Sequence, residues 1–487
     1  MDILNQLALS PFEWTMSDKV SASPMEFVVR LDCVGNVDAT KFTEAISAEL
    51  KRQPLLQANA TVGETHRDSY WRPASNCTPK IHWYDENPDQ GSGFPKDFAP
   101  IDLESEIGCR FYGWRFLAND RECVVLKFVY HHACCDGKGS IAFAENTLHR
   151  YQCLLDQNAT LVGDLKVVDP QQLLNRNSPT TNKLGTIDRV WRALLIRPKR
   201  VGNMLLSKPR LLSRSARVAN GGDVDLYSNP PRHCSTELSV DETKRLGVLA
   251  KKLSASSNTI LARELFHVLN DHFEDDLNLA DDGNAETSDA RAKSNRALRI
   301  LIPFSLRDET HNKMPAANCV SMAYLEARQE ILSEDSSNNP VLVSELVEQV
   351  SFIRRWNLQY SWIESIESFA KIWPIVKLFK FRKASPTKKA PIATTVMTNL
   401  GRVFRGSGLV DNEGTLAVNG MVVNSFHLIL PCTATTMVNF SVNFYGNRLT
   451  LDAAYLPSLQ DRETVETLLH SWKQRILDSV AGLQIAG

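Results

Sequence analysis

The 487-residue sequence lacks the features that mark several specialised classes of protein. No apolar run approaches the ~18 residues that cross a bilayer, and the first residues carry neither the basic nor the apolar part of a secretory signal. The 10 cysteines include no C-x-x-C spacing, which argues against a zinc ribbon or a disulfide framework and fits reduced thiols. A net charge of −1 removes any global attraction to nucleic acid. We therefore expect a cytoplasmic protein that binds no nucleic acid.

The residues that are present predict a globular chain with large cores. Hydrophobic residues make up 43% of the sequence and charged residues 23%, as in ordinary folded domains. Alternating or continuous apolar patterns predict strands at 26–34, 123–130, 297–304, 392–398, 438–445 and 448–455. The last two form a hairpin across Gly446-Asn447.

Helical spacing and capping residues complete the predicted elements. Helices are expected after Asp38, after Ser239, and over 141–155, 257–272 and 465–480. The acid-rich residues 274–292 are expected to form a solvated loop. The fold class is therefore α+β. We expect an N-terminal lobe at 1–170, a basic linker or excursion at 171–233 and a C-terminal lobe at 234–487.

One segment contains candidate catalytic residues: Tyr130-His131-His132-Ala133-Cys134-Cys135-Asp136-Gly137. Two histidines end a hydrophobic strand, which holds a side chain rigidly, and the glycine lets the backbone turn away. An imidazole placed there can accept a proton, because its ordinary pKa of about 6.5 lies near neutral pH. Asp136 either orients the imidazole, as in a catalytic triad, or holds the turn by pairing with an arginine. The local sequence does not choose between these two roles.

Other interpretations of this segment are weaker. A histidine pair taken alone is more often half-buried and hydrogen-bonded than catalytic. A metal site is disfavoured because five donors within six residues of a turn do not converge easily, and zinc prefers ligand pairs spaced by two to four residues. Cys134 and Cys135 are expected to be packing residues, since free cysteine is usually buried.

The motif resembles the signature His-His-x-x-x-Asp-Gly of the chloramphenicol acetyltransferase-like, condensation-domain superfamily of acyltransferases. Four further stretches resemble family segments and lie in the right order: Lys51–Leu56, Ile302–Arg307 with Asn318–Val320, Thr398–Val403 and Phe444–Thr450. The third and fourth are similar to segments of the free-standing alcohol acyltransferase, mycolipid-acyltransferase and wax-ester-synthase branches. The plant-type Asp-Phe-Gly-Trp-Gly motif is absent, and Asn258-Thr259 stands where wax ester synthases have Asn-Asp.

The resemblance implies a pseudo-dimer of two chloramphenicol-acetyltransferase-like lobes with a tunnel between them. It assigns His132 as the general base at the tunnel centre, with His131 beside it. It makes Asp136 a structural acid paired with Arg307, and it places Gly137 at the turn by the donor channel. The implied reaction moves an acyl group from a coenzyme A thioester to an alcohol or amine. The alternative is a carrier-protein-dependent condensation enzyme that forms an amide or ester. A catalytically silent binding module is a third reading, against which the intact motif argues.

Two segments rich in basic and apolar residues are not explained by the family resemblance. Residues 185–217 carry nine Arg or Lys against Asp188 alone, and residues 371–389 carry seven and no acid. Such segments can bind an anionic membrane surface or the phosphates of coenzyme A. Equally, their apolar side chains can pack onto the lobes while the basic groups stay in water. We assign donor binding to Lys380, Arg382 and Asn399. We expect a monomer with acyl-CoA as co-substrate, a small-molecule acceptor, no permanently bound cofactor and no metal.

Overall fold

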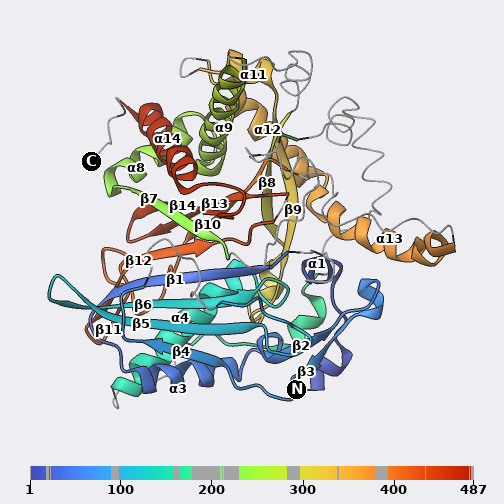
Figure 1. Ribbon diagram of the computed structural model, residues 1–487, viewed down its shortest axis with the longest axis vertical. Coiled ribbons are helices and arrows are strands. Elements are labelled where there is room, and N and C mark those ends of the chain that lie inside the picture. Colours follow the sequence, from blue (N-terminus) through green and yellow to red (C-terminus); the bar gives the residue numbers. More distant parts are fainter. Residues whose placement is uncertain are drawn as a thin grey trace.

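The computed structural model consists of two lobes, each built around a six-stranded sheet (Figure 1). It describes residues 2–17, 21, 23–88, 98–156, 165–177, 209–210, 212, 230–281, 297–336, 339–378, 393–433, 435–481 and 483. Each lobe has its own hydrophobic core. The α+β class with two lobes, predicted from the sequence, is therefore observed.

The first lobe contains the sheet β11-β12-β1-β6-β5-β4. Its strands are β1 (Glu26–Val34), β4 (Lys80–Tyr84), β5 (Cys109–Ala118), β6 (Arg121–His131), β11 (Ala417–Val418) and β12 (Met421–Ile429). Helices α3 (Ala39–Leu50) and α4 (Gly137–Leu155) pack against each other. Smaller elements are η1 (Asp2–Gln6), α1 (Pro11–Met16), η2 (Pro54–Gln57), β2 (Ala58–Thr61), η3 (His66–Asp68), β3 (Tyr70–Pro73) and η4 (Pro170–Asn175).

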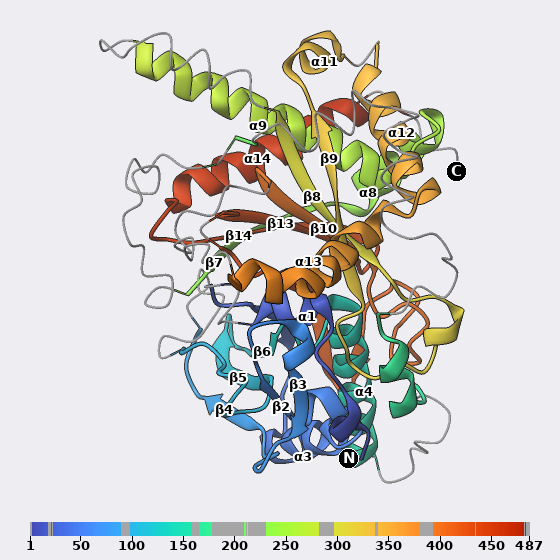
Figure 2. The same ribbon diagram turned by 90° about the vertical axis from the view of Figure 1, so that its right-hand side faces the viewer.

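The second lobe contains the sheet β7-β14-β13-β10-β8-β9. Its strands are β7 (Arg232–Leu238), β8 (Leu298–Ser305), β9 (Val320–Ala327), β10 (Thr395–Arg402), β13 (Val438–Tyr445) and β14 (Arg448–Tyr455). The larger helices are α8 (Val240–Lys252), α9 (Ser257–Asp281), α12 (Val341–Arg355) and α14 (Arg462–Val480), with α11 (Gln329–Glu334), η5 (Glu309–His311) and η6 (Leu358–Tyr360) between them. Helix α13 (Ser361–Leu378) contacts α1 of the first lobe and β9 of the second (Figure 2).

Two connections tie the lobes together. Strands β11 and β12 come late in the chain, within 234–487, yet β12 joins the first sheet by antiparallel pairing with β1 from Val28↔Ile429 to Val34↔Val422. Residues 306–319, between β8 and β9, reach back to the first lobe, where the Ala316 N–H donates to Gln53 Oε1 at 2.7 Å. Segments from the C-terminal part of the chain therefore form part of the first lobe or contact it directly.

Most of the predicted helices and strands are present, and some begin or end at other residues than predicted. The predictions of β1, the β13–β14 hairpin and the Ser239 cap of α8 are confirmed. Helix α4 begins four residues before the predicted position, and β10 begins at Thr395 rather than residue 392. The predicted loop is wrong over 274–281, where α9 continues. Its Glu274 carboxylate accepts a hydrogen bond from the Asn270 amide within α9 and one from the Gln329 amide, which connects this turn to α11.

Little of the two basic segments falls within the described residues. The predicted linker begins with residues 171–177, where Arg176 forms a buried ion pair with Glu13 of α1 at 2.6 Å. Of residues 185–217, only 209, 210 and 212 are described; the Arg210 guanidinium lies 4.1 Å from the centre of the Phe273 ring. Residues 371–378 form the end of α13, and Lys380 and Arg382 lie outside the described residues. In the described part of the chain, no helix combines the length and apolarity needed to cross a membrane.

Candidate active site

The chain backbone holds His132 rigidly just beyond the end of β6. The last residue of that strand, His131, pairs with Glu26 of β1, and its N–H donates to the carbonyl of Gly108 at 2.9 Å. The N–H of His132 itself donates to the carbonyl of Met25 at 2.8 Å. Hydrogen bonds to two neighbouring segments therefore hold the pair of histidines in place.

The side chain of His132 is partly buried at the junction of the two lobes. Its ring packs against Phe27, with ring centres 5.0 Å apart. Its Nδ1 lies 3.5 Å from the Nδ2 of Asn318, which also donates to the His132 carbonyl at 2.8 Å. Asn318 belongs to the connection before β9 of the second lobe, so the imidazole is positioned by groups from both lobes.

The surroundings of His132 favour its neutral form. Burial lowers the pKa of His132 below its usual 6.5, and the neighbouring His131 acts in the same direction. Hydrogen bonding to backbone carbonyls and the negative charge of Asp136 oppose this shift without cancelling it. A neutral imidazole at neutral pH can accept a proton, which is the property a general base requires.

The other histidine of the pair points into the protein. The side chain of His131 is fully buried, and its Nδ1 accepts a hydrogen bond from the N–H of Ala133 at 3.2 Å. A ring nitrogen without solvent access cannot reach a bound acceptor. Of the two histidines, only His132 is placed to meet a substrate.

Asp136 is occupied by contacts that lead away from His132. Its Oδ1 caps helix α4 by accepting the N–H of Gly139 at 2.8 Å, and its Oδ2 accepts the N–H of Cys319 at 2.9 Å. The same Oδ2 forms an ion pair with the Arg307 guanidinium. Burial lowers the pKa of Arg307, but the Asp136 carboxylate outweighs it and raises that pKa above its ordinary value. Of the two roles left open by the sequence, this geometry corresponds to the ion pair.

Two glycines in the turn allow the second lobe to come close. A Cβ on Gly137 would lie 2.6 Å from Cδ2 of Leu400 on β10. A Cβ on Gly139 would lie 3.0 Å from the Cys135 sulfur and 3.2 Å from Cα of Ala316, in the connection between β8 and β9. The first neighbour is the end of a flexible side chain, whereas the second set includes backbone that cannot move aside easily.

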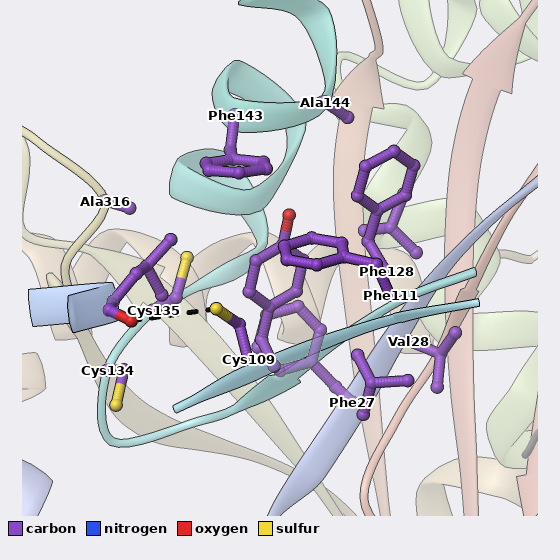
Figure 3. Packing of buried hydrophobic residues seen from close by; sticks show 14 of the residues in the cluster. Phe27, Val28, Cys109, Phe111, Phe128, Cys134, Cys135, Phe143, Ala144 and Ala316 are labelled. Carbon is purple, nitrogen blue, oxygen red and sulfur yellow. Dashed lines mark hydrogen bonds between the residues drawn. The ribbon is translucent and has the colours of Figure 1, made fainter. Parts of the chain in front are cut away.

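The two cysteines of the motif are part of the hydrophobic core. Figure 3 shows Cys134 and Cys135 among buried groups that include Phe27, Phe143 and Ala316. Both thiols are fully buried, and burial raises the pKa of Cys134 and of Cys135 well above the usual 9.0. A protonated thiol inside a core is a poor nucleophile, so the geometry fits packing rather than covalent catalysis.

The structure describes one of the three residues that we assigned to donor binding. Asn399 lies on β10, where its Oδ1 accepts the N–H of Gly401 at 2.6 Å and its Nδ2 donates to Asn258 at the start of α9. These bonds stay within the second lobe. The next residue, Leu400, is the one that faces Gly137. The Thr398–Val403 segment and the histidine motif therefore meet at the lobe junction.

Two residues of this site were not singled out from the sequence. Asn318 was named only as the first residue of the stretch Asn318–Val320, and Gly139 was not named. The signal for Gly139 was present, because a second glycine two residues after Gly137 suits a close approach of backbone. Asn318 lies 186 residues from His132 and gives no local signal.

Comparisons with known proteins show which solved structures share this fold. No family model matches the sequence, and a search of curated proteins finds no match. Solved structures match over nearly the whole chain. The first condensation domain of the calcium-dependent antibiotic synthetase, in complex with a substrate analogue, is 14% identical over 98% of this chain and 96% of that chain, with a TM-score of 0.64.

Two other matches show the range of reactions among the similar structures. The trichothecene 15-O-acetyltransferase TRI3 from Fusarium sporotrichioides is 12% identical over 97% of this chain and 94% of its own, with a TM-score of 0.62. The starter condensation domain of rhizomide synthetase, crystallised as a variant with C8-CoA, is 12% identical over 98% and 95%, with a TM-score of 0.61. At these identities the likeness concerns the fold: this chain has the two-lobed condensation-domain, chloramphenicol acetyltransferase-like fold.

Proposed function

We propose that this protein is an acyltransferase that moves an acyl group from a coenzyme A thioester to an alcohol or amine, with His132 as the general base. The observation that carries the proposal is the position of His132. A partly buried imidazole with a lowered pKa stands at the junction of the lobes, while the neighbouring carboxylate is held by Arg307. This combination provides a base, and the nearby thiols of Cys134 and Cys135 are buried in the core.

The chemistry needs little more than a base and correct orientation. Nδ1 of His132 faces Asn318, so Nε2 is the nitrogen that we assign to the acceptor. Nε2 takes the proton from the acceptor's hydroxyl or amine as the oxygen or nitrogen attacks the thioester carbonyl carbon. The tetrahedral intermediate then collapses, the carbon–sulfur bond breaks, and the imidazolium returns the proton to the leaving thiolate. A thioester is already activated, so a covalent enzyme intermediate is not required.

Product analysis tests this proposal directly. The purified protein is incubated with a panel of acyl-CoA donors and a mixture of alcohols and amines, and products are identified by mass spectrometry. We expect an ester or an amide together with one equivalent of free coenzyme A. Failure of every acyl-CoA, with turnover restored by an acylated carrier protein, would instead support the carrier-protein-dependent condensation enzyme.

Two matched variants test the role of His132. His132→Ala should reduce turnover about 10²–10⁴-fold, which is the usual contribution of one general base. His131→Ala should affect turnover less, because its side chain is enclosed in the first lobe. Near-full turnover of a folded His132→Ala protein would contradict the assignment.

A further inference from the structure

A second group of ionisable side chains lies between the two sheets, away from the candidate active site. His233 on β7, His427 on β12 and Asp452 on β14 meet where the strands of the two lobes face each other (Figure 1). Asp32 on β1 borders this group, and it lies six residues along the strand from Glu26, the partner of His131. At ~3.3 Å per residue the group is about 20 Å from the histidine motif.

The three side chains present a convergent set of donor atoms. One atom of each lies within 4.8 Å of the other two, and the residues are 5%, 6% and 1% exposed. The closest pair is His427 Nδ1 and Asp452 Oδ1, at 2.7 Å. Among the residues that the structure describes, Nδ1 of His233 is buried and has no hydrogen-bond partner. A buried nitrogen without a partner is costly, so it needs an explanation.

The surrounding groups orient these donors as the outer shell of a metal site does. The other ring nitrogen of His427, Nε2, lies 3.0 Å from the Ser425 hydroxyl and 3.6 Å from the Asp32 carboxylate. Metal-bound histidines usually donate their second nitrogen to such a group. The second carboxylate oxygen of Asp452 accepts from Asn443 Nδ2 at 3.3 Å. Within the described chain, Oδ1 of the same Asn443 is buried and without a hydrogen-bond partner, which leaves a further oxygen beside the site.

We propose that His233, His427 and Asp452 bind a divalent transition-metal ion of the zinc type. Two imidazoles and one carboxylate suit zinc, whereas magnesium prefers oxygen ligands and its own water. The ion takes the place of the proton between His427 and Asp452, and a ring nitrogen of His233 supplies the third ligand atom. The nearby cations Arg30 and Lys127 oppose binding, and Arg30 is paired with Asp32 at 2.7 Å.

The placement of the three ligands indicates what the ion would do. His427 belongs to the sheet of the first lobe, whereas His233 and Asp452 belong to the sheet of the second. An ion bound by all three joins the lobes, so it stabilises the folded protein, and the stabilisation grows with the logarithm of the free ion concentration relative to Kd. This inference does not rest on the proposed acyl transfer and can be tested without any substrate.

Binding is tested with zinc alone on the full chain. The protein is stripped with a chelator, and zinc binding is measured by calorimetry and by melting temperature at mildly alkaline pH, because the ion must displace a proton. We expect one equivalent of zinc to bind and to raise the melting temperature, while magnesium has no effect. His233→Gln should weaken zinc binding at least about tenfold, as loss of a metal ligand or its support does. The matched control His82→Gln, an exposed histidine on β4, should bind like the unaltered protein.

A second measurement, which needs no variant, distinguishes this site from zinc bound by cysteine. X-ray absorption of the zinc-loaded protein should show nitrogen and oxygen ligands at about 2.0–2.1 Å with imidazole scattering. Sulfur ligands at about 2.3 Å, no saturable binding, or binding that His233→Gln leaves unchanged would each overturn the proposal.

Discussion

Replacing Asp136 by asparagine tests the ion pair that joins the histidine motif to the second lobe. Asp136 is 1% exposed, and the Arg307 side chain that it faces is 14% exposed. Asparagine has nearly the same shape and keeps an oxygen to cap α4, since it is as good a cap as aspartate. The substitution therefore removes the charge and leaves the helix start intact.

The expected loss follows from the contacts that asparagine cannot make. Removing one member of a buried ion pair costs about 3–5 kcal/mol, because the remaining charge is left unpaired. Arg307 keeps a hydrogen bond to the Ala317 carbonyl at 3.1 Å and some exposure, which favours the lower end. The Cys319 N–H also loses a charged acceptor, and such terms are not additive for groups in contact. We therefore expect Asp136→Asn to lower the free energy of unfolding by about 3 kcal/mol.

Urea unfolding monitored by tryptophan fluorescence measures this loss. Asp38→Asn is the matched control: it changes an exposed cap of α3 for which the described residues show no ion pair, and should change stability by less than about 0.5 kcal/mol. Once Asp136 is asparagine, adding Arg307→Met should cost much less than it does in the unaltered protein. If Asp136→Asn left the melting temperature unchanged but greatly reduced activity, Asp136 would act by orienting the base, and the structural role would be wrong.

The remaining predictions concern the base, the glycine turn and the proposed donor-binding residues. Because burial lowers the pKa of His132, kcat/KM should fall only as the pH drops through a midpoint below 6.5; a midpoint at or above that value would contradict the assignment. Gly139→Ala should destabilise the protein by about 1–3 kcal/mol through overpacking against the second lobe, and Gly137→Ala by less, as measured by urea unfolding; the reverse order would refute the close approach. Activity with acyl-CoA should decrease with ionic strength, and charge reversal at Lys380 and Arg382 should raise the KM for the donor, whereas an unchanged KM would exclude them from donor binding.

The sequence by itself determined the features that depend on neighbouring residues. Strand β1 and the β13–β14 hairpin follow from patterns a few residues long, and each lies where its pattern placed it. The cap of α8 follows from Ser239 and the acid three residues later. The histidine motif could be recognised for the same reason, since its strand, turn and side chains occupy one short segment. The loop predicted over 274–281 was wrong because it too was inferred from neighbouring residues alone. In the structure α9 continues there, and Glu274 contacts α11.

Only the tertiary structure decided what these local pieces do. Asp136 could have oriented a histidine or paired with an arginine, and the choice depends on Arg307, 171 residues away. The crossover of β12 into the first sheet and the contact of Asn318 with His132 likewise join distant parts of the chain. The cluster of His233, His427 and Asp452 has no sequence signature, since its members come from three separate strands. Periodicity reports which face of an element is buried, whereas the partner that covers it is selected by packing of the whole chain.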